Sequence, residues 1–329
     1  MRRIPSLSAW RAAVIGLCAA VAAASDEPSC SLAPGGERRS LPLVLSKSPR
    51  VYLLEGFLNG AEISHLYGVA RELGVFGEAA PDPSDKQDNR GYHQEYVPES
   101  RYAADPLLDG IEERIALQAH IPRDPGAAAT LSVNVRNATE AVGMTNLHHD
   151  HNAAAMAIQE YARQGRRVPL TELRATLLAY FSDVERGGET VFPCICNRTE
   201  ESCRQAQSAC KYLYENGVLN VHPKGHNSPF KLQKVDDAVR DKIKKAARLL
   251  VKRSVRLCSG ESALGLSVAP RAGRAMLFFS NGVRGQADPR VWHGSCRVTA
   301  GQKMAIQRFL YAPQAEEETG AHAAARFDW

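Results

Sequence analysis

The spacing of apolar residues changes part-way along the chain from a helical period to a strand period, and this change limits the fold most. Asn59 opens a helical segment, and Glu62 follows three residues later, as in a capping box. Its apolar positions keep helical spacing: Ile63, Leu66, Ala70 and Leu73. A second helix is expected from Asp105-Pro106 until Pro122 ends it. Its apolar face is Leu108, Ile111, Ile115 and Ala119.

Short segments with strand-like patterns surround and follow these helices. Leu131 to Val135 alternates between apolar and polar residues, and Arg50 to Leu54 is an earlier strand-like run. Further strands are expected on both sides of a Gly187-Gly188 turn and in a late group: 174–181, 189–192, 275–279, 291–293 and 303–311. Helices followed by many short strands predict an α+β chain with a sandwich or barrel of β-strands.

The remaining segments suggest the domain organisation. Residues 76–100 are rich in Pro, Gly, Asp and Ser and are interpreted as a long loop, while residues 314–329 form an acidic, Ala-rich tail that we expect to be mobile. Residues 194–265 are interpreted as a Cys-rich, partly helical insertion in the β-fold. The amphipathic helix at its centre carries Val235, Val239, Ile243, Ala246 and Leu250.

The first 24 residues have the layout of a cleavable signal peptide. Arg2 and Arg3 precede a short apolar run, Ala12 to Ala24, and Ala22-Ala23-Ala24 fits a small-residue cleavage site. An uncleaved membrane anchor is the alternative, although the run is shorter than the roughly 20 residues that span a bilayer. We therefore expect the endoplasmic reticulum or secretory pathway, with membrane contact only if the segment stays uncleaved.

The cysteines favour an oxidising compartment. Of the 8 cysteines, Cys18 lies in the signal segment, and four crowd between residues 194 and 210 beside polar residues, where disulfides are expected. A zinc site is the alternative, but Cys-x-Cys followed by single cysteines is poor ligand spacing. The mature chain keeps an odd number of cysteines, so one is expected to be either a free thiol or bonded to a partner. Two glycosylation sequons, at Asn137 and Asn197, agree with secretion.

The net charge of +5 does not indicate a nucleic-acid partner. A nucleic-acid binder is expected to show a basic stripe with interleaved aromatic residues. Here much of the positive charge lies in residues 234–256, where a solvated helix face explains it.

The densest group of metal-capable side chains is His148-His149-Asp150-His151. Residues two apart in an extended segment point to the same face, so His148 and Asp150 present an imidazole and a carboxylate together. With a distant histidine they form a facial triad for non-haem iron(II), and His293 is the candidate. A polar His-rich loop is the alternative. Lys303, among apolar strand residues, favours a nearby anion such as a dicarboxylate, unless the lysine lies on an exposed face.

The run Leu177 to Pro193, which contains Gly187-Gly188-Glu189-Thr190, resembles the signature strand pair of prolyl 4-hydroxylases. His293 to Val298, with Gly301-Gln302-Lys303 behind it, resembles the second signature of that family. The resemblance covers roughly residues 42–313 without the insertion. It also extends to three earlier motifs: Ser48-Pro49-Arg50, Gly56-Phe57-Leu58 and Ile111 to Ile115 before Ile121-Pro122.

This resemblance implies an Fe(II)- and 2-oxoglutarate-dependent dioxygenase with a double-stranded β-helix (jelly-roll) core and flanking N-terminal helices. It implies that His148, Asp150 and His293 hold the iron, that Lys303 pairs with the distal carboxylate of 2-oxoglutarate, and that Thr190 assists it. O2 is the further substrate and ascorbate the further cofactor implied, and the product is 4-hydroxyproline in a proline-containing polypeptide.

Three residues depart from the family pattern. Arg136 stands where the family has a tyrosine that touches 2-oxoglutarate, and the following loop to His148 is longer. Met304 replaces an aromatic residue, and Arg297 replaces a proline. These departures concern the co-substrate pocket rather than the iron triad.

Other functions remain open from the sequence. One alternative is a 2-oxoglutarate hydroxylase acting on lysine or a small molecule, and another is a non-catalytic binding module on the same scaffold. A disulfide-rich structural protein explains the insertion but not the ordered motifs. Tyr92, Tyr96 and Tyr102 are candidates to line a groove for the polypeptide, with a solvated loop as the alternative.

Overall fold

A computed structural model describes the parts of the chain that build the fold. These parts are residues 41–76, 92–97, 101, 104–123, 132–137, 147–151, 171–197, 199–221, 227–229, 236–282 and 286–313. They belong to one compact unit, Leu41–Trp329. The expected signal peptide, the acidic tail, Cys18, Cys30 and Tyr102 lie outside the described residues. In these parts of the chain, no helix combines the length and apolarity needed to cross a membrane.

Both N-terminal helices are present where the sequence predicts them. Helix α2 (Gly60–Glu72) starts at Asn59, whose side chain and that of Glu62 form the reciprocal capping box. Helix α4 (Pro106–Ala119) starts at Asp105, whose carboxylate accepts a hydrogen bond from the Leu108 amide. It ends earlier than expected, because His120 takes a left-handed conformation (φ 52°) before Pro122 is reached.

The strands of the largest sheet, as described, are β1 (Leu43–Lys47), β2 (Arg50–Leu54), β3 (Tyr92–Tyr96), β4 (Ser132–Asn137), β6 (Thr171–Tyr180), β12 (Ala275–Phe279) and β15 (Gln302–Pro313). Their order is β1-β2-β12-β6-β15-β4-β3, and every neighbouring pair is antiparallel. The predicted long loop over 76–100 therefore contains an edge strand, β3, where Tyr96 is 55% exposed.

Shorter strands form the layer that carries the signature motifs. They are β5 (Leu147–His148), β8 (Thr190–Phe192), β9 (Val218–Val221), β10 (Asn227–Pro229), β11 (Leu266–Val268) and β13 (Gly294–Ser295). Two sheets, β10-β9-β5 and β11-β8-β13, are linked by an antiparallel bridge between His148 and His293. A small ribbon joins β7 (Arg186–Gly187) to β14 (Val298–Ala300). The chain is thus a mixed α and β structure with antiparallel sheets, as the α+β prediction requires.

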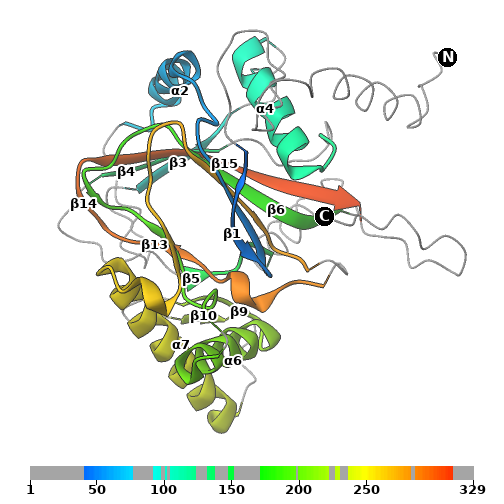
Figure 1. The fold of residues 1–329 in the computed structure, drawn as a ribbon, viewed down its shortest axis with the longest axis vertical. Helices are drawn as coiled ribbons and strands as arrows, with labels where there is room; N and C mark the ends of the chain where they lie inside the picture. Colours follow the sequence, from blue (N-terminus) through cyan, green and yellow to red (C-terminus); the bar gives the residue numbers. More distant parts are fainter. Residues whose placement is uncertain are drawn as a thin grey trace, which may run out of the picture. The chain divides into compact units, whose positions relative to one another are not determined.

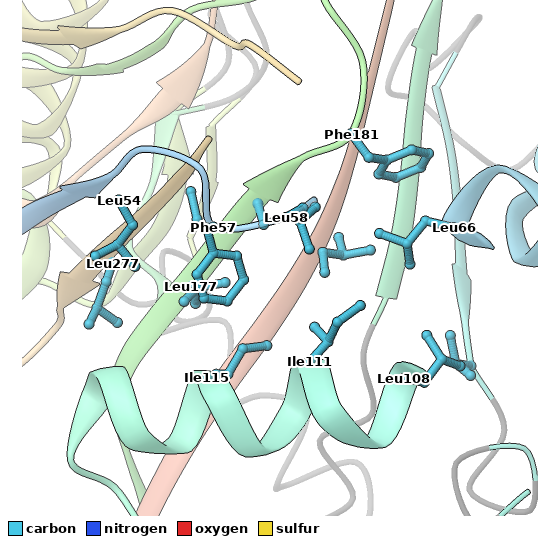
Figure 2. Close-up of a cluster of buried hydrophobic side chains, with 14 of the residues drawn as sticks. Leu54, Phe57, Leu58, Leu66, Leu108, Ile111, Ile115, Leu177, Phe181 and Leu277 are labelled. Atoms are coloured by element: carbon cyan, nitrogen blue, oxygen red, sulfur yellow. The ribbon is translucent and has the colours of Figure 1, made fainter. Parts of the chain in front are cut away.

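Alternation along the strands gives the seven-stranded sheet two different faces. One face packs on α2 and α4 through the apolar cluster in Figure 2, where Ile111 and Ile115 of α4 meet Leu177 of β6. The other face carries side chains that point toward the shorter strands, among them Val51, Tyr180 and Phe278. Because Lys303 and Met304 are consecutive on β15, they point to opposite faces, and Met304 belongs to the helix-covered cluster.

The Cys-rich segment starts after β8 and ends before β11, two strands that pair with each other. It contains α6 (Glu201–Glu215) and α7 (Asp237–Cys258), which lie together beside β9 and β10 in Figure 1. Three disulfides join six described cysteines: Cys194–Cys210, Cys196–Cys203 and Cys258–Cys296. These bonds confirm the disulfide interpretation over the zinc alternative.

Two local predictions were wrong or incomplete. The strand expected over 291–293 is the end of a 3-10 helix, η3 (Pro289–Val291), and the strand starts only at Gly294. Helix α6 was missed, because its buried face is made largely of small residues and cysteines rather than large apolar ones. That face consists of Cys203, Ala206, Ala209, Cys210 and Leu213.

Candidate metal centre

Three side chains from distant parts of the sequence converge between the two layers. His148 lies on β5, Asp150 follows it, and His293 follows η3. The backbones of His148 and His293 exchange two hydrogen bonds, of 2.9 and 3.0 Å. One ligand atom from each of the three residues lies within 4.8 Å of the others. Among the described residues, this is the cluster of histidine, cysteine and acidic side chains with metal-binding geometry.

The carboxylate of Asp150 sits between the two imidazoles. Its Oδ1 atom is 3.3 Å from His148 Nε2 and 3.5 Å from His293 Nε2. Oδ1 is buried and has no well-formed hydrogen bond within the described part of the chain, whereas Oδ2 accepts one of 2.7 Å from Thr176 Oγ1. A buried oxygen that faces two ring nitrogens without a donor fits a bound cation. The donor set of two imidazoles and one carboxylate suits Fe(II).

The charges around Asp150 favour its ionised form. Burial alone raises the pKa of this carboxyl, but the neighbouring His293 and His148 and the Thr176 hydroxyl lower it by more, so the pKa falls below its usual range. An ionised carboxylate is the form that binds a metal.

His293 is held with one nitrogen ready for a ligand. Its Nδ1 lies 3.0 Å from the Val291 carbonyl oxygen, which can only accept, so Nδ1 carries the hydrogen and Nε2 presents its lone pair. The rings of Phe278 and Phe192 pack at 4.8 and 5.4 Å. Burial lowers the pKa of His293 to about 4, which keeps the imidazole neutral at physiological pH.

Lys303 forms a second polar cluster close to the triad. It is 5% exposed, which rules out the solvent-facing alternative for this lysine. Its Nζ donates to Gly188 O at 2.6 Å, to Ser295 Oγ at 2.9 Å and to Thr190 Oγ1 at 3.4 Å, all uncharged oxygens. Burial is the largest cause of the lowered pKa of His293, and the positive charge of the Lys303 ammonium lowers it further.

Three supporting residues were not identified from the sequence. Thr176 faces Asp150 from β6, and Tyr180, four residues further along the same strand, bonds Thr190 Oγ1 at 2.9 Å through its hydroxyl. His149, between two of the candidate ligands, is buried with its Nε2 2.9 Å from Asp288 O. Strand alternation indicates that Thr176 and Tyr180 share a face, but only the packing of the layers shows that this face meets the triad.

Comparison with known proteins finds relatives that are prolyl 4-hydroxylases among the curated sequences. No protein-family model matches the chain. Prolyl 4-hydroxylase 1 of Arabidopsis thaliana is 26% identical over 275 residues, which are 82% of this chain and 71% of the relative. Prolyl 4-hydroxylase 2 of the same plant is 25% identical over 277 residues, or 81% and 69% of the two chains. The chain is a homologue of the prolyl 4-hydroxylases. The relatives that it matches are enzymes named for the hydroxylation of proline.

Solved structures similar to this prolyl 4-hydroxylase homologue include enzymes of the same name. The viral collagen prolyl hydroxylase of Paramecium bursaria Chlorella virus-1, solved with 2-oxoglutarate, has 12% identity and a TM-score of 0.40, covering 80% of this chain and 96% of the viral one. A Pseudomonas putida prolyl-4-hydroxylase has 8% identity and a TM-score of 0.36, covering 79% and 91%.

The departures from the prolyl 4-hydroxylase pattern fall at different places in the fold. The backbone of Arg136 on β4 is the cross-strand partner of Lys303, so the position lies next to the lysine in register. Met304 is buried on the helix-covered face, away from Lys303. Arg297 follows Cys296, and its carbonyl oxygen accepts a hydrogen bond from the Gly188 amide at 3.1 Å.

Proposed function

We propose that this chain hydroxylates peptidyl proline at carbon 4, with Fe(II) held by His148, Asp150 and His293. The observation that carries the proposal is the convergence of these three side chains around a buried carboxylate oxygen without a hydrogen-bond donor. The homology to prolyl 4-hydroxylases supplies the reaction class and the substrate. In the overall reaction proline, 2-oxoglutarate and O2 become hydroxyproline, succinate and CO2.

Bound iron and 2-oxoglutarate supply the oxidising chemistry, while the protein places and isolates them. Lys303 binds the distal carboxylate of 2-oxoglutarate, and Thr190 assists, because both side chains already form one buried polar cluster. Thr176 holds the Asp150 carboxylate in place. Phe192 and Phe278 cover His293 and exclude water from that side of the centre.

We also propose a double-stranded β-helix topology and a location in the secretory pathway. The two antiparallel layers, joined at His148 and His293, support a double-stranded β-helix, with 194–265 as an insertion. Three disulfides favour the secretory pathway, where the expected signal peptide directs the chain. Ascorbate is the reductant we expect to sustain turnover. Of the two glycosylation sequons, at Asn137 and Asn197, we favour Asn197, which lies on an exposed turn.

The test is incubation of the mature chain with Fe(II), 2-oxoglutarate, ascorbate and a proline-rich peptide. We expect mass spectrometry to find one added oxygen on proline and succinate in equal amount. Asp150→Ala removes the charged ligand and abolishes both products. Succinate without peptide oxidation would point to lysine or a small molecule as the substrate, and neither product would favour the non-catalytic binding module.

A further inference from the structure

The two histidines of the triad are members of a longer cross-strand row. Strand β9 pairs with β5 in the register Asn220 opposite His148 and Val221 opposite Leu147. His148 is in turn bridged to His293 on its other side. Asn220, His148 and His293 therefore lie side by side on three adjacent backbone segments, although Asn220 comes 72 residues after His148 in the sequence.

Strand alternation fixes the face on which Asn220 lies. Leu147 and Val221, the neighbouring cross-strand pair, are both completely buried in the apolar cluster that α6 and α7 build. Residues directly opposite each other in an antiparallel pair share a face, and the next pair along takes the other face. The imidazole of His148 faces Asp150 and His293. The side chain of Asn220 is therefore on the face of the metal ligands.

The exposed fractions of the three ligand side chains show from which side a substrate can reach the metal centre. The side chains of Asp150 and His293 are 1% and 8% exposed, whereas that of His148 is 34% exposed. The accessible edge of the triad is therefore the His148 edge. Asn220, with intermediate exposure, stands on the next strand outward along that edge.

We propose that Asn220 binds the main chain of the polypeptide substrate where it crosses the metal centre, an inference that rests on the proposed function. Proline has no backbone N–H, so a proline-rich segment offers mainly carbonyl oxygens, and in its extended polyproline II form these have no internal hydrogen bonds. The Nδ2 group of an asparagine donates to such a carbonyl. Asn220 comes from the Cys-rich segment, which thereby contributes to substrate binding.

The test measures binding of a fluorescein-labelled decaproline to the Mn(II)-loaded full chain with 2-oxoglutarate, by fluorescence anisotropy. Asn220→Ala removes the donor and raises the dissociation constant about five- to tenfold. Asn220→Asp keeps the shape but replaces the donor with a second acceptor, so it weakens binding at least as much. Asn216→Ala is the matched control, because Asn216 lies in the same segment and donates to Tyr212 O within α6, and we expect no change.

Metal affinity separates a substrate contact from a structural role. Co(II) absorption titration of Asn220→Ala reports whether the triad is intact, and we expect wild-type affinity. Unchanged peptide binding in the Asn220 variants would overturn the inference, as would parallel losses of Co(II) and peptide affinity. A wild-type chain that binds Co(II) but neither binds nor oxidises proline peptides would instead refute the proposed substrate.

Discussion

The hydroxyl of Thr176 controls the orientation of the Asp150 carboxylate. Its hydrogen bond to Oδ2 leaves Oδ1 directed at the two imidazole nitrogens. Both residues are buried, so water cannot replace the lost donor. Groups that orient metal ligands in this way are worth about ten- to hundredfold in metal affinity.

Replacing Thr176 therefore tests the metal centre without removing a ligand. Thr176→Val preserves the shape of the side chain, and we expect metal affinity to fall about tenfold or more. Absorption titration with Co(II) measures the change. Thr299→Val, which removes an exposed hydroxyl, is the control. Equal Co(II) affinity in Thr176→Val and wild type would show that the hydrogen bond does not orient the ligand.

The ammonium of Lys303 gives the second prediction at this scale. Lys303→Gln keeps a hydrogen-bond donor but removes the charge, and charge-assisted hydrogen bonds contribute about 1.5–3 kcal/mol. We expect the KM for 2-oxoglutarate to rise about ten- to hundredfold in the succinate assay, with little change in Co(II) affinity. Lys242→Gln, on the exposed face of α7, controls for loss of positive charge. A normal KM in Lys303→Gln would remove the lysine from the co-substrate site.

At the scale of elements, the Cys-rich segment supports the metal centre from several directions. Strand β9 pairs with the strand that carries His148. The ring of Tyr214 on α6 packs at a tilt against that of His149, with the centroids 4.9 Å apart, and its hydroxyl bonds His151 Nδ1 at 3.2 Å. Arg253 of α7 is buried and donates to three backbone carbonyls: Pro193 O, Leu264 O and Ser202 O. The segment is thus packed into the structure rather than attached at its surface.

The disulfides of this segment should contribute unequally to stability. Cys258–Cys296 closes a separation of 38 residues and Cys196–Cys203 one of 7, so chain entropy predicts losses of about 4 and about 2 kcal/mol. Paired Cys→Ala substitutions, unfolded in urea, measure both. Only the Cys258–Cys296 pair should also weaken Co(II) binding, because Cys296 follows β13 and lies three residues after His293. Equal effects of the two pairs on Co(II) binding would contradict this.

At the scale of the whole molecule, two buried histidines make stability depend on pH. Burial lowers the pKa of both His149 and His293 from 6.5 to about 4. The unfolded chain then binds protons at a pH where the folded chain does not. The free energy of unfolding therefore has its full value, as far as these two histidines are concerned, above pH 6.5, and it decreases as the pH falls toward 4.

We expect the metal-free protein to lose up to about 1.4 kcal/mol per pH unit for each of these histidines. Urea unfolding between pH 6.5 and 5, before most carboxylates titrate, measures the slope. His149→Gln removes one of the two groups and should reduce the slope by about half. A stability that stays constant over this range, or an unchanged slope in His149→Gln, would contradict the assignment.

Local patterns in the sequence were sufficient for the two capped helices, the strands β2 and β12, and the pairing of His148 with Asp150. Capping boxes and strand alternation depend on neighbours a few residues apart, so the sequence contains them completely. The His-x-Asp pair requires a distant third ligand, for which His293 was the candidate, and Lys303 among apolar residues indicated a nearby anion. The structure brings His293 to the pair and buries Lys303 against Thr190 and Ser295. The short strands β5, β9 and β13 were not predictable, because two to four residues carry too little periodicity.

The sequence by itself determined which side chains can bind a metal and which cysteines sit near one another. The tertiary structure decided that Lys303 is buried, that Thr176 faces Asp150, and that Asn220 joins the row of the ligands. These facts depend on which strands lie side by side and which sheet face meets which. Contacts between strands far apart in the chain arise from burial of the whole apolar surface, and no local pattern encodes them.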